Sequence, residues 1–232
     1  MAQLNHLNPY RRLLHGLTGL LALSPMWGHA QSNWPSKPIH FIVPFSAGGA
    51  NDLMGRAAAE GASKVLGQTV VVDNRPGAGG SLGASIVAKS APDGYTFLIS
   101  AAGTISNPMI KASSPYKDED LLPVALIALA PSMVVVPHHA KYQNLKDFVE
   151  ASKASQGFNF ATAGSGSTPH FVAEILNVKY GAKLQPVPYK SGSESTTAVM
   201  GGQVEGTSEA SIIALPHILH DGKFKALATT WT

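Results

Sequence analysis

The chain has 232 residues, of which 44% are hydrophobic and 13% charged, and its formal net charge is +3. This apolar fraction is sufficient for a packed core, and the low charge argues against a disordered chain. The absence of cysteine excludes disulfide scaffolds, thiolate metal sites and cysteine nucleophiles. No cluster of Lys and Arg is longer than Arg11-Arg12, so we expect no nucleic-acid partner.

Residues 1–30 have the features of a secretory signal peptide. A polar start leads to Arg11-Arg12, the apolar run 13–23 and the small residues around Gly28-His29-Ala30. The apolar run is about half the roughly 20 residues that a membrane span requires. The pattern therefore predicts export and cleavage near Ala30, and the arginine pair leaves the export route open.

Apolar runs rich in β-forming residues alternate with stretches of helical spacing along the rest of the chain. The spacing predicts strands at 39–43, 69–72, 96–99, 124–129, 133–136, 184–187 and 226–229. It predicts helices at 52–66, 82–90, 145–155, 169–180, 195–200 and 211–220. This alternation is typical of an α/β fold with a mostly parallel sheet.

The segment between residues 100 and 130 contains several residues that disfavour regular secondary structure, namely Gly103, Pro108, Pro115 and Pro123. Because such residues punctuate secondary structure, we expect a boundary in this region. The division that follows is a signal peptide at 1–30, a first α/β lobe at 31–105 and a second α/β lobe at 106–225.

Three glycine-rich loops stand at predicted strand-to-helix junctions, at 45–52, 74–81 and 161–168. Glycine lets backbone amides approach a ligand closely, and the helix behind each loop adds a partial positive charge. In an open parallel sheet, ligands bind at this end of the strands. The loops therefore favour an anionic ligand such as a carboxylate or phosphate, and the alternative is that their glycines serve only tight turns.

Other chemistries fit the sequence poorly. The dinucleotide pattern G-x-G-x-x-G fails in the second and third loops, and no Walker A sequence occurs. The two histidines His217 and His220 have no further ligands at zinc spacing, so we expect neither metal nor cofactor. The segment 79–83 does match G-x-S-x-G. A secreted serine hydrolase that uses Ser81 is thus an alternative hypothesis, although Arg75-Pro76-Gly77-Ala78 intervene between the strand and this serine.

Several short motifs, taken in their order, resemble the Bug family, the TctC-like periplasmic solute-binding proteins of tripartite tricarboxylate transporters. The motifs cover the whole mature chain and comprise 34–39, 43–49 with Asp52 and Arg56, 74–80, 91–96, Pro188-Tyr189-Lys190, 201–204, 215–218, Gly222-Lys223 and Ala226-Leu227-Ala228. The resemblance implies the two-lobe type II periplasmic binding-protein fold. It also implies a non-enzymatic, periplasmic receptor that captures a small organic carboxylate and delivers it to membrane permease subunits, and we expect a monomer.

The resemblance further implies a ligand site with contributions from both lobes. From the first lobe these would be Phe45, Ala47, Gly48, Gly49, Asn51, Asp52, Ala101, Ala102, Gly103 and Thr104. From the second lobe they would be Thr162, Ala163, Gly164, Ser165, Gly166, His170, Tyr189 and Glu209. Asp52 has the alternative role of a helix cap, because its carboxylate would repel an anionic ligand.

Three features depart from the family pattern. Glu209-Ala210 stands where the family usually has Asp-Asn, and 191–194 replaces an apolar turn that contains proline. The sequence also stops at Thr232, just after the strand by which the resemblance implies a return to the first lobe at 226–232. The resemblance therefore predicts a C-terminally truncated fold, and the further hypotheses are a non-functional copy and a receptor read by a sensor protein.

Overall fold

The computed structural model describes residues 34–110 and 113–230, with Ala102 described by its backbone alone. The predicted signal peptide lies outside these residues. All the elements below belong to one compact unit, Pro35–Thr232. Within the described part of the chain, no helix is long and apolar enough to cross a membrane.

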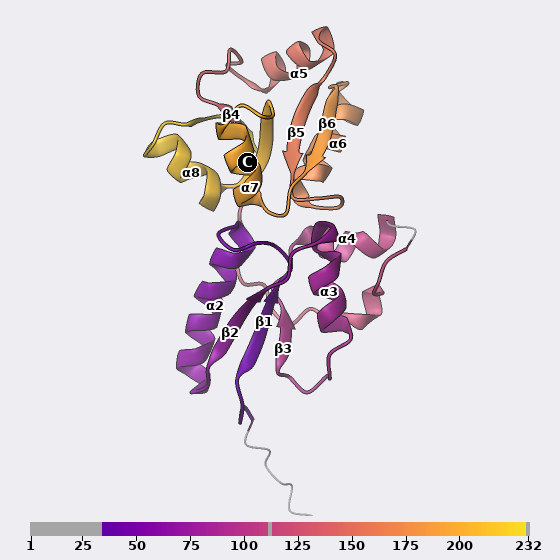
Figure 1. The fold of residues 1–232 in the computed structure, drawn as a ribbon, viewed down its shortest axis with the longest axis vertical. Helices are drawn as coiled ribbons and strands as arrows, with labels where there is room; N and C mark the ends of the chain where they lie inside the picture. The colour runs from indigo at the N-terminus through magenta and orange to yellow at the C-terminus, as the bar shows by residue number, and fades with distance from the viewer. Residues whose placement is uncertain (1–33, 111–112, 231–232) are drawn as a thin grey trace, which may run out of the picture. The chain divides into compact units, whose positions relative to one another are not determined.

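The first sheet has three parallel strands in the order β2-β1-β3 (Figure 1). The central strand is β1 (Ile39–Val43), and its neighbours are β2 (Val70–Asn74) and β3 (Thr96–Leu98). Helix α2 (Ala50–Leu66) connects β1 to β2 and packs against both. The short helix η2 (Ala78–Gly80) and α3 (Ser81–Ala88) connect β2 to β3.

Helix α4 (Ala102–Ile110) occupies a region that the sequence analysis assigned to a lobe boundary. Pro108 lies inside this helix and has no N–H to donate to the carbonyl of Thr104. The phenol of Tyr116 donates to that carbonyl instead. The helix packs against η2 and α3, so the expected boundary at 105/106 cuts an element that belongs with the first sheet. The chain continues through the short helix η3 (Asp118–Asp120).

Residues 121–131 carry no regular secondary structure. The predicted strand at 124–129 is wrong, since this segment pairs with no described strand. Leu122, Val124 and Leu126 are more than 70% exposed. An apolar run becomes a strand only where a neighbouring backbone supplies hydrogen bonds, and no described backbone does so here.

The second sheet has five strands in the order β6-β5-β7-β4-β8. These are β4 (Ser132–Pro137), β5 (Phe158–Thr162), β6 (Leu184–Pro188), β7 (Gly206–Ala210) and β8 (Phe224–Thr229). Strand β5 runs parallel to β6 and β7, whereas β4 runs antiparallel to β7 and β8. The expected return to the first lobe at 226–232 is therefore wrong for the described residues, because β8 completes the second sheet.

Four helices cover the second sheet, and each face has its own apolar cluster. Helices α5 (Leu145–Ala154) and α6 (Thr168–Tyr180) contribute to one cluster, and α7 (Gly192–Met200) and α8 (Ser211–Leu219) contribute to the other. Successive side chains of β4 point to opposite faces of the sheet, so Val134 and Val136 belong to one cluster and Val135 belongs to the other. Helix α5 begins with a side-chain cap, because Asn144 accepts a 2.9 Å hydrogen bond from the Asp147 amide.

Candidate functional site

The first glycine-rich loop joins β1 to α2. Gly48 has φ +80°, a conformation that side chains disfavour, and its amide donates a 2.9 Å hydrogen bond to Oδ2 of Asp52. Gly49 precedes the first helical residue and offers no side-chain cap. Asp52 therefore reaches back from the first turn of α2 and binds the Gly48 amide that the resemblance assigned to the ligand.

The carboxylate of Asp52 is the centre of a hydrogen-bond network. Arg56 binds both oxygens, with Nε 3.0 Å from Oδ2 and Nη2 3.0 Å from Oδ1. The Asn74 amide nitrogen donates to Oδ1 at 2.9 Å and to the Phe45 carbonyl at 3.0 Å. Burial by itself raises the pKa of Asp52, but the hydrogen bonds from Arg56, Gly48 and Asn74 together lower it below its ordinary value. The geometry thus gives Asp52 the capping role and ties the first loop to the second.

The second loop carries four consecutive residues of positive φ, from Gly77 to Gly80. Ala78 adopts φ +50°, the one such non-glycine residue in the described chain. A left-handed residue with a side chain costs on the order of 1 kcal/mol, and such strain is often found at binding sites. The sequence analysis named this loop as suited to anions but left its residues out of the ligand site.

The third loop, between β5 and α6, uses several of its polar groups internally. The Gly166 amide donates to Nδ1 of His170 at 3.2 Å, and the Gly164 amide donates to Oγ1 of Thr162 at 3.3 Å. His170 was expected to hold the ligand, but here its ring holds the loop. The Ser165 amide donates to no group in the described part of the chain, so it keeps its capacity to bind an anion.

The second and third loops touch backbone to backbone. A Cβ at Gly79 would overlap the carbonyl oxygen of Ser165, and a Cβ at Gly103 would overlap that of Gly166. The side chain of Asn107 is fully buried beside this contact and donates to the Gly79 carbonyl at 3.1 Å. Glycine is therefore required where these loops meet, and not merely to turn the chain.

A cavity of about 370 Å³ lies where the loops meet. Its walls combine both loops with the end of β6, and its lining residues are Phe45, Gly77, Ala78, Gly79, Gly80, Ala163, Gly164, Ser165, Pro188, Tyr189 and Lys190. Lys190 is the one charged residue among them, and it makes no ion pair with any described residue. Backbone amides with one lysine form a site that suits a small anion.

The cavity includes only part of the expected site. Five predicted residues line it, namely Phe45, Ala163, Gly164, Ser165 and Tyr189. The others lie outside its walls, and they are Ala47, Gly48, Gly49, Asn51, Asp52, Ala101, Ala102, Gly103, Thr104, Thr162, Gly166, His170 and Glu209. Their assignment to ligand binding stays a prediction. Gly77 to Gly80, Pro188 and Lys190 line the cavity but were absent from the expected site, although the motifs at 74–80 and 188–190 contain them.

Glu209 was expected to shape the ligand site, but its side chain packs against the N-terminus of α7. It is 5% exposed, and its carboxyl group is packed so closely on Gly192 that no Cβ would fit there. Burial raises the pKa of Glu209 to about 8, against a small lowering from the Thr207 hydroxyl 3.5 Å away. This carboxyl group is therefore neutral at pH 7.

Ser81, the residue of the alternative hydrolase hypothesis, is the first residue of α3 and is 2% exposed. Its hydroxyl group interacts with the phenol of Tyr116. A nucleophile must reach a substrate and a general base, and this buried serine faces a tyrosine. The geometry therefore gives Ser81 a structural role.

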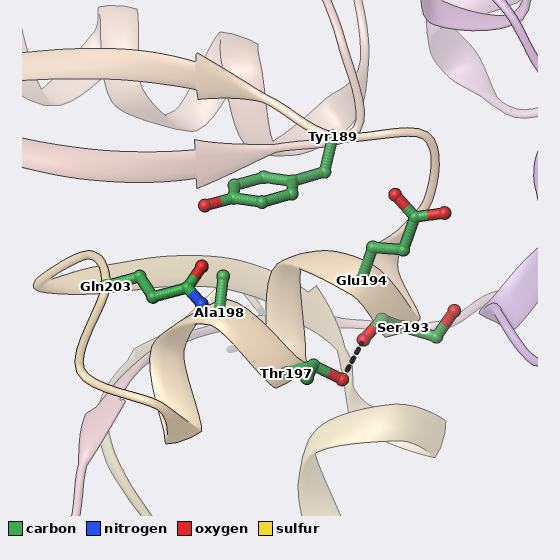
Figure 2. A pocket seen from close by; sticks show the side chains of 6 residues that line it. All are labelled: Tyr189, Ser193, Glu194, Thr197, Ala198 and Gln203. Atoms are coloured by element: carbon green, nitrogen blue, oxygen red, sulfur yellow. Dashed lines mark hydrogen bonds between the residues drawn. The ribbon is translucent and has the colours of Figure 1, made fainter.

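A second hollow, of about 350 Å³, lies next to the first cavity and shares Tyr189 with it (Figure 2). The other residues that line it are Ser193, Glu194, Thr197, Ala198 and Gln203. In Figure 2 the ring of Tyr189 lies over α7, with Glu194 towards one end and Gln203 towards the other. This region was not among the expected ligand residues apart from Tyr189, and the only related signal was the departure from the family pattern at 191–194.

Comparison with solved structures identifies the class of protein, a periplasmic binding-protein fold. The structure of the periplasmic binding protein BugD aligns with a TM-score of 0.80 and 31% identity, over 85% of this chain and 67% of that one. MatC from Rhodopseudomonas palustris, solved with bound malate, aligns with a TM-score of 0.79 and 29% identity, over 86% of this chain and 68% of that one. The expected α/β binding-protein fold is confirmed.

The chain belongs to the tripartite tricarboxylate transporter family receptors, whose family pattern matches residues 54–232. Among curated relatives, BugT of Bordetella pertussis is 38% identical over 202 residues, which is 84% of this chain and 61% of that protein. The chain thus spans about three fifths of the length of this relative. The expected membership of the Bug family is confirmed, and these relatives are named as receptors and binding proteins rather than enzymes.

Proposed function

We propose that this protein is an exported receptor that binds a small organic carboxylate in the cavity between the glycine-rich loops. The observation that carries the proposal is the lining of that cavity, where the backbone of both loops surrounds a space whose one charged residue is Lys190. Amides at the ends of loops donate to carboxylate oxygens, and an ammonium group balances their charge. The malate bound to MatC supports a carboxylate as the ligand class.

The partner in this proposal is the permease of a tripartite tricarboxylate-type transporter, and the location is the periplasm. Membership of the tripartite tricarboxylate transporter receptors supports the partner, and the likeness to BugD, a periplasmic binding protein, supports the location. Export would remove residues 1–30 near Ala30, as the sequence analysis predicts.

A thermal melt of the protein with millimolar mono-, di- and tricarboxylates tests the ligand class. A ligand at 100 times its Kd stabilises the folded state by about 2.7 kcal/mol, which raises the Tm by several degrees. Lys190→Gln is expected to weaken binding about tenfold, because it removes the cation. Lys146→Gln, on α5 and outside the cavity, is the matched control and should bind like the original protein. A cooperative melt that no carboxylate shifts would contradict the proposal.

A further inference from the structure

The hollow beside Tyr189 differs in charge from the carboxylate cavity. Lys190 lines the cavity, whereas Glu194 lines the hollow and no lysine or arginine does; Tyr189 belongs to the lining of both. Glu194 makes no ion pair with any residue in the described ranges. Two ligand-binding spaces of opposite charge therefore meet at one aromatic ring.

The carboxylate of Glu194 is held in position without being neutralised. Its Oε2 accepts a 3.1 Å hydrogen bond from the Lys190 amide, and its Oε1 accepts a 3.4 Å hydrogen bond from the hydroxyl of Ser46. A carboxylate has about four acceptor positions, so two such bonds leave capacity for another donor. The backbone and the first loop thus fix the orientation of this carboxylate, and no lysine or arginine of the described ranges forms an ion pair with it.

The remaining groups of the hollow also suit a positive ligand group. The face of the Tyr189 ring attracts cations, and the side-chain oxygen of Gln203 accepts hydrogen bonds. The Tyr189 backbone is fixed because its amide donates to the Thr162 carbonyl at 2.8 Å. Thr197 also lines the hollow, and its hydroxyl donates a 3.0 Å hydrogen bond to the Ser193 carbonyl within α7 (Figure 2). A second carboxylate would meet repulsion from Glu194 here, whereas an ammonium group would find three favourable partners.

We propose that this hollow is an ammonium subsite, and that the ligand is an amino carboxylate whose carboxylate lies in the glycine-loop cavity and whose ammonium group lies against Tyr189 and Glu194. The inference rests on the proposed carboxylate-binding function and names the ligand class more narrowly. Glu194 determines specificity, because it favours an ammonium end over a second carboxylate end.

Calorimetric titration with matched pairs of probes tests the subsite. The pairs are butyrate with 4-aminobutyrate, valerate with 5-aminovalerate, and hexanoate with 6-aminohexanoate, and glutarate represents the dicarboxylates. At least one amino carboxylate should bind about tenfold more tightly than its partner, and more tightly than glutarate. Glu194→Gln should bring that pair to within about twofold and leave the simple carboxylate unchanged.

Glu194→Gln should keep the local structure. The glutamine side-chain oxygen can still accept the hydrogen bond from the Lys190 amide, and glutamine suits the third position of a helix such as α7 as well as glutamate does. Its Tm, measured alongside, checks the fold. Glu150→Gln, an exposed glutamate of α5, is the matched charge control and should keep the full preference. Gln203→Ala is the second test, at the exposed end of the hollow, and should reduce the preference about threefold.

The outcomes separate the two proposals. Equal binding within every pair, tighter binding of glutarate, or a preference that survives Glu194→Gln would overturn the ammonium subsite and leave carboxylate binding in place. Failure of all the probes to bind would overturn the carboxylate function and the subsite together.

Discussion

Each of the two sheets buries one carboxyl group next to the loops, and the two groups are held in opposite states. Asp52, beside the first sheet, has the guanidinium of Arg56 on both oxygens, and its pKa is lowered in spite of its burial. Glu209, in the second sheet, has no cation, and burial raises its pKa to about 8. The comparison shows that partners, rather than burial alone, decide the charge of an acid next to an anion site.

The two sheets also differ in how completely they are covered. Every residue of β2 and β3 is only partly buried, whereas Phe148, Phe160 and Phe224 around the second sheet are at most 1% exposed. Both apolar clusters belong to the second sheet. Most of the hydrophobic contribution to stability therefore comes from the second sheet, while the first sheet supplies loops to the cavity.

Truncating one phenylalanine in each sheet gives the largest expected difference. Phe160→Ala should lower the free energy of unfolding by about 3 to 5 kcal/mol, because it leaves a cavity in a fully buried cluster. Phe97→Ala, in half-buried β3, should cost about 1 to 2 kcal/mol, since its ring is partly solvated and packs edge-on against Phe41. Urea unfolding measures both, and equal costs would contradict the difference in coverage.

Because Glu209 is protonated in the folded protein at neutral pH, the free energy of unfolding should depend on pH. The substitution Glu209→Gln should remove this dependence. The folded protein keeps the proton up to about pH 8, whereas the unfolded chain loses it above its ordinary pKa of 4.5. The stabilising contribution of the protonated carboxyl group is therefore fully present below that lower value, and it falls as the pH rises towards 8, by on the order of 5 kcal/mol.

The measurement is the difference in unfolding free energy between the glutamine variant and the original protein at several pH values across this window. The difference should move in favour of the variant as the pH rises. A difference that does not change with pH would show that Glu209 ionises normally.

Gly103→Ala tests the contact between α4 and the third loop. A Cβ there would overlap the Gly166 carbonyl oxygen, and the backbone needs no positive φ, so the effect is steric alone. We expect a loss of about 1 to 3 kcal/mol in unfolding free energy. Gly61→Ala, on the exposed side of α2 with nothing within 4 Å, is the control and should gain about 0.5 to 1 kcal/mol. Equal behaviour of the two variants would remove the evidence that α4 touches the third loop.

Asp52→Asn should have the smallest effect, a loss of about 1 to 2 kcal/mol at neutral pH, because Arg56 is half-exposed and water screens the pair. Since the pKa of Asp52 is lowered in the folded protein, its contribution is present above the ordinary value of 3.8 and is lost as the pH falls below it. Acid titration of both proteins should therefore bring their stabilities together. A gap that persists in acid would contradict this account of the network.

The sequence was sufficient for most elements of the fold, and the failures have physical causes. Strand β5 was missed although Phe158 and Phe160 are buried on either side of the exposed Asn159, an alternation only three residues long. Strand β7 was missed because its Thr207, Ser208 and Glu209 are buried polar residues that no hydrophobic pattern reveals. Helix α4 was missed because Pro108 is usually a helix breaker, and only the distant Tyr116 satisfies the carbonyl that proline leaves without a donor. The predicted strand at 124–129 failed because strand formation depends on a partner.

The site was predictable as a set of glycine-rich loops but not as a set of residues. Spacing showed that all three loops could present amides, but it could not show that Asp52 already binds the Gly48 amide or that His170 already binds the Gly166 amide. The contribution of Lys190 likewise depends on how β6 ends beside the loops.

Amide chemical shifts of the ¹⁵N-labelled protein, followed while a carboxylate or amino carboxylate is titrated in, test the central claim most directly. The account predicts saturable shifts at Gly79, Gly80, Gly164 and Ser165, the backbone groups that line the cavity, with smaller changes on distant β8. Saturable shifts confined to other parts of the chain would contradict the claim that these loops form the ligand site.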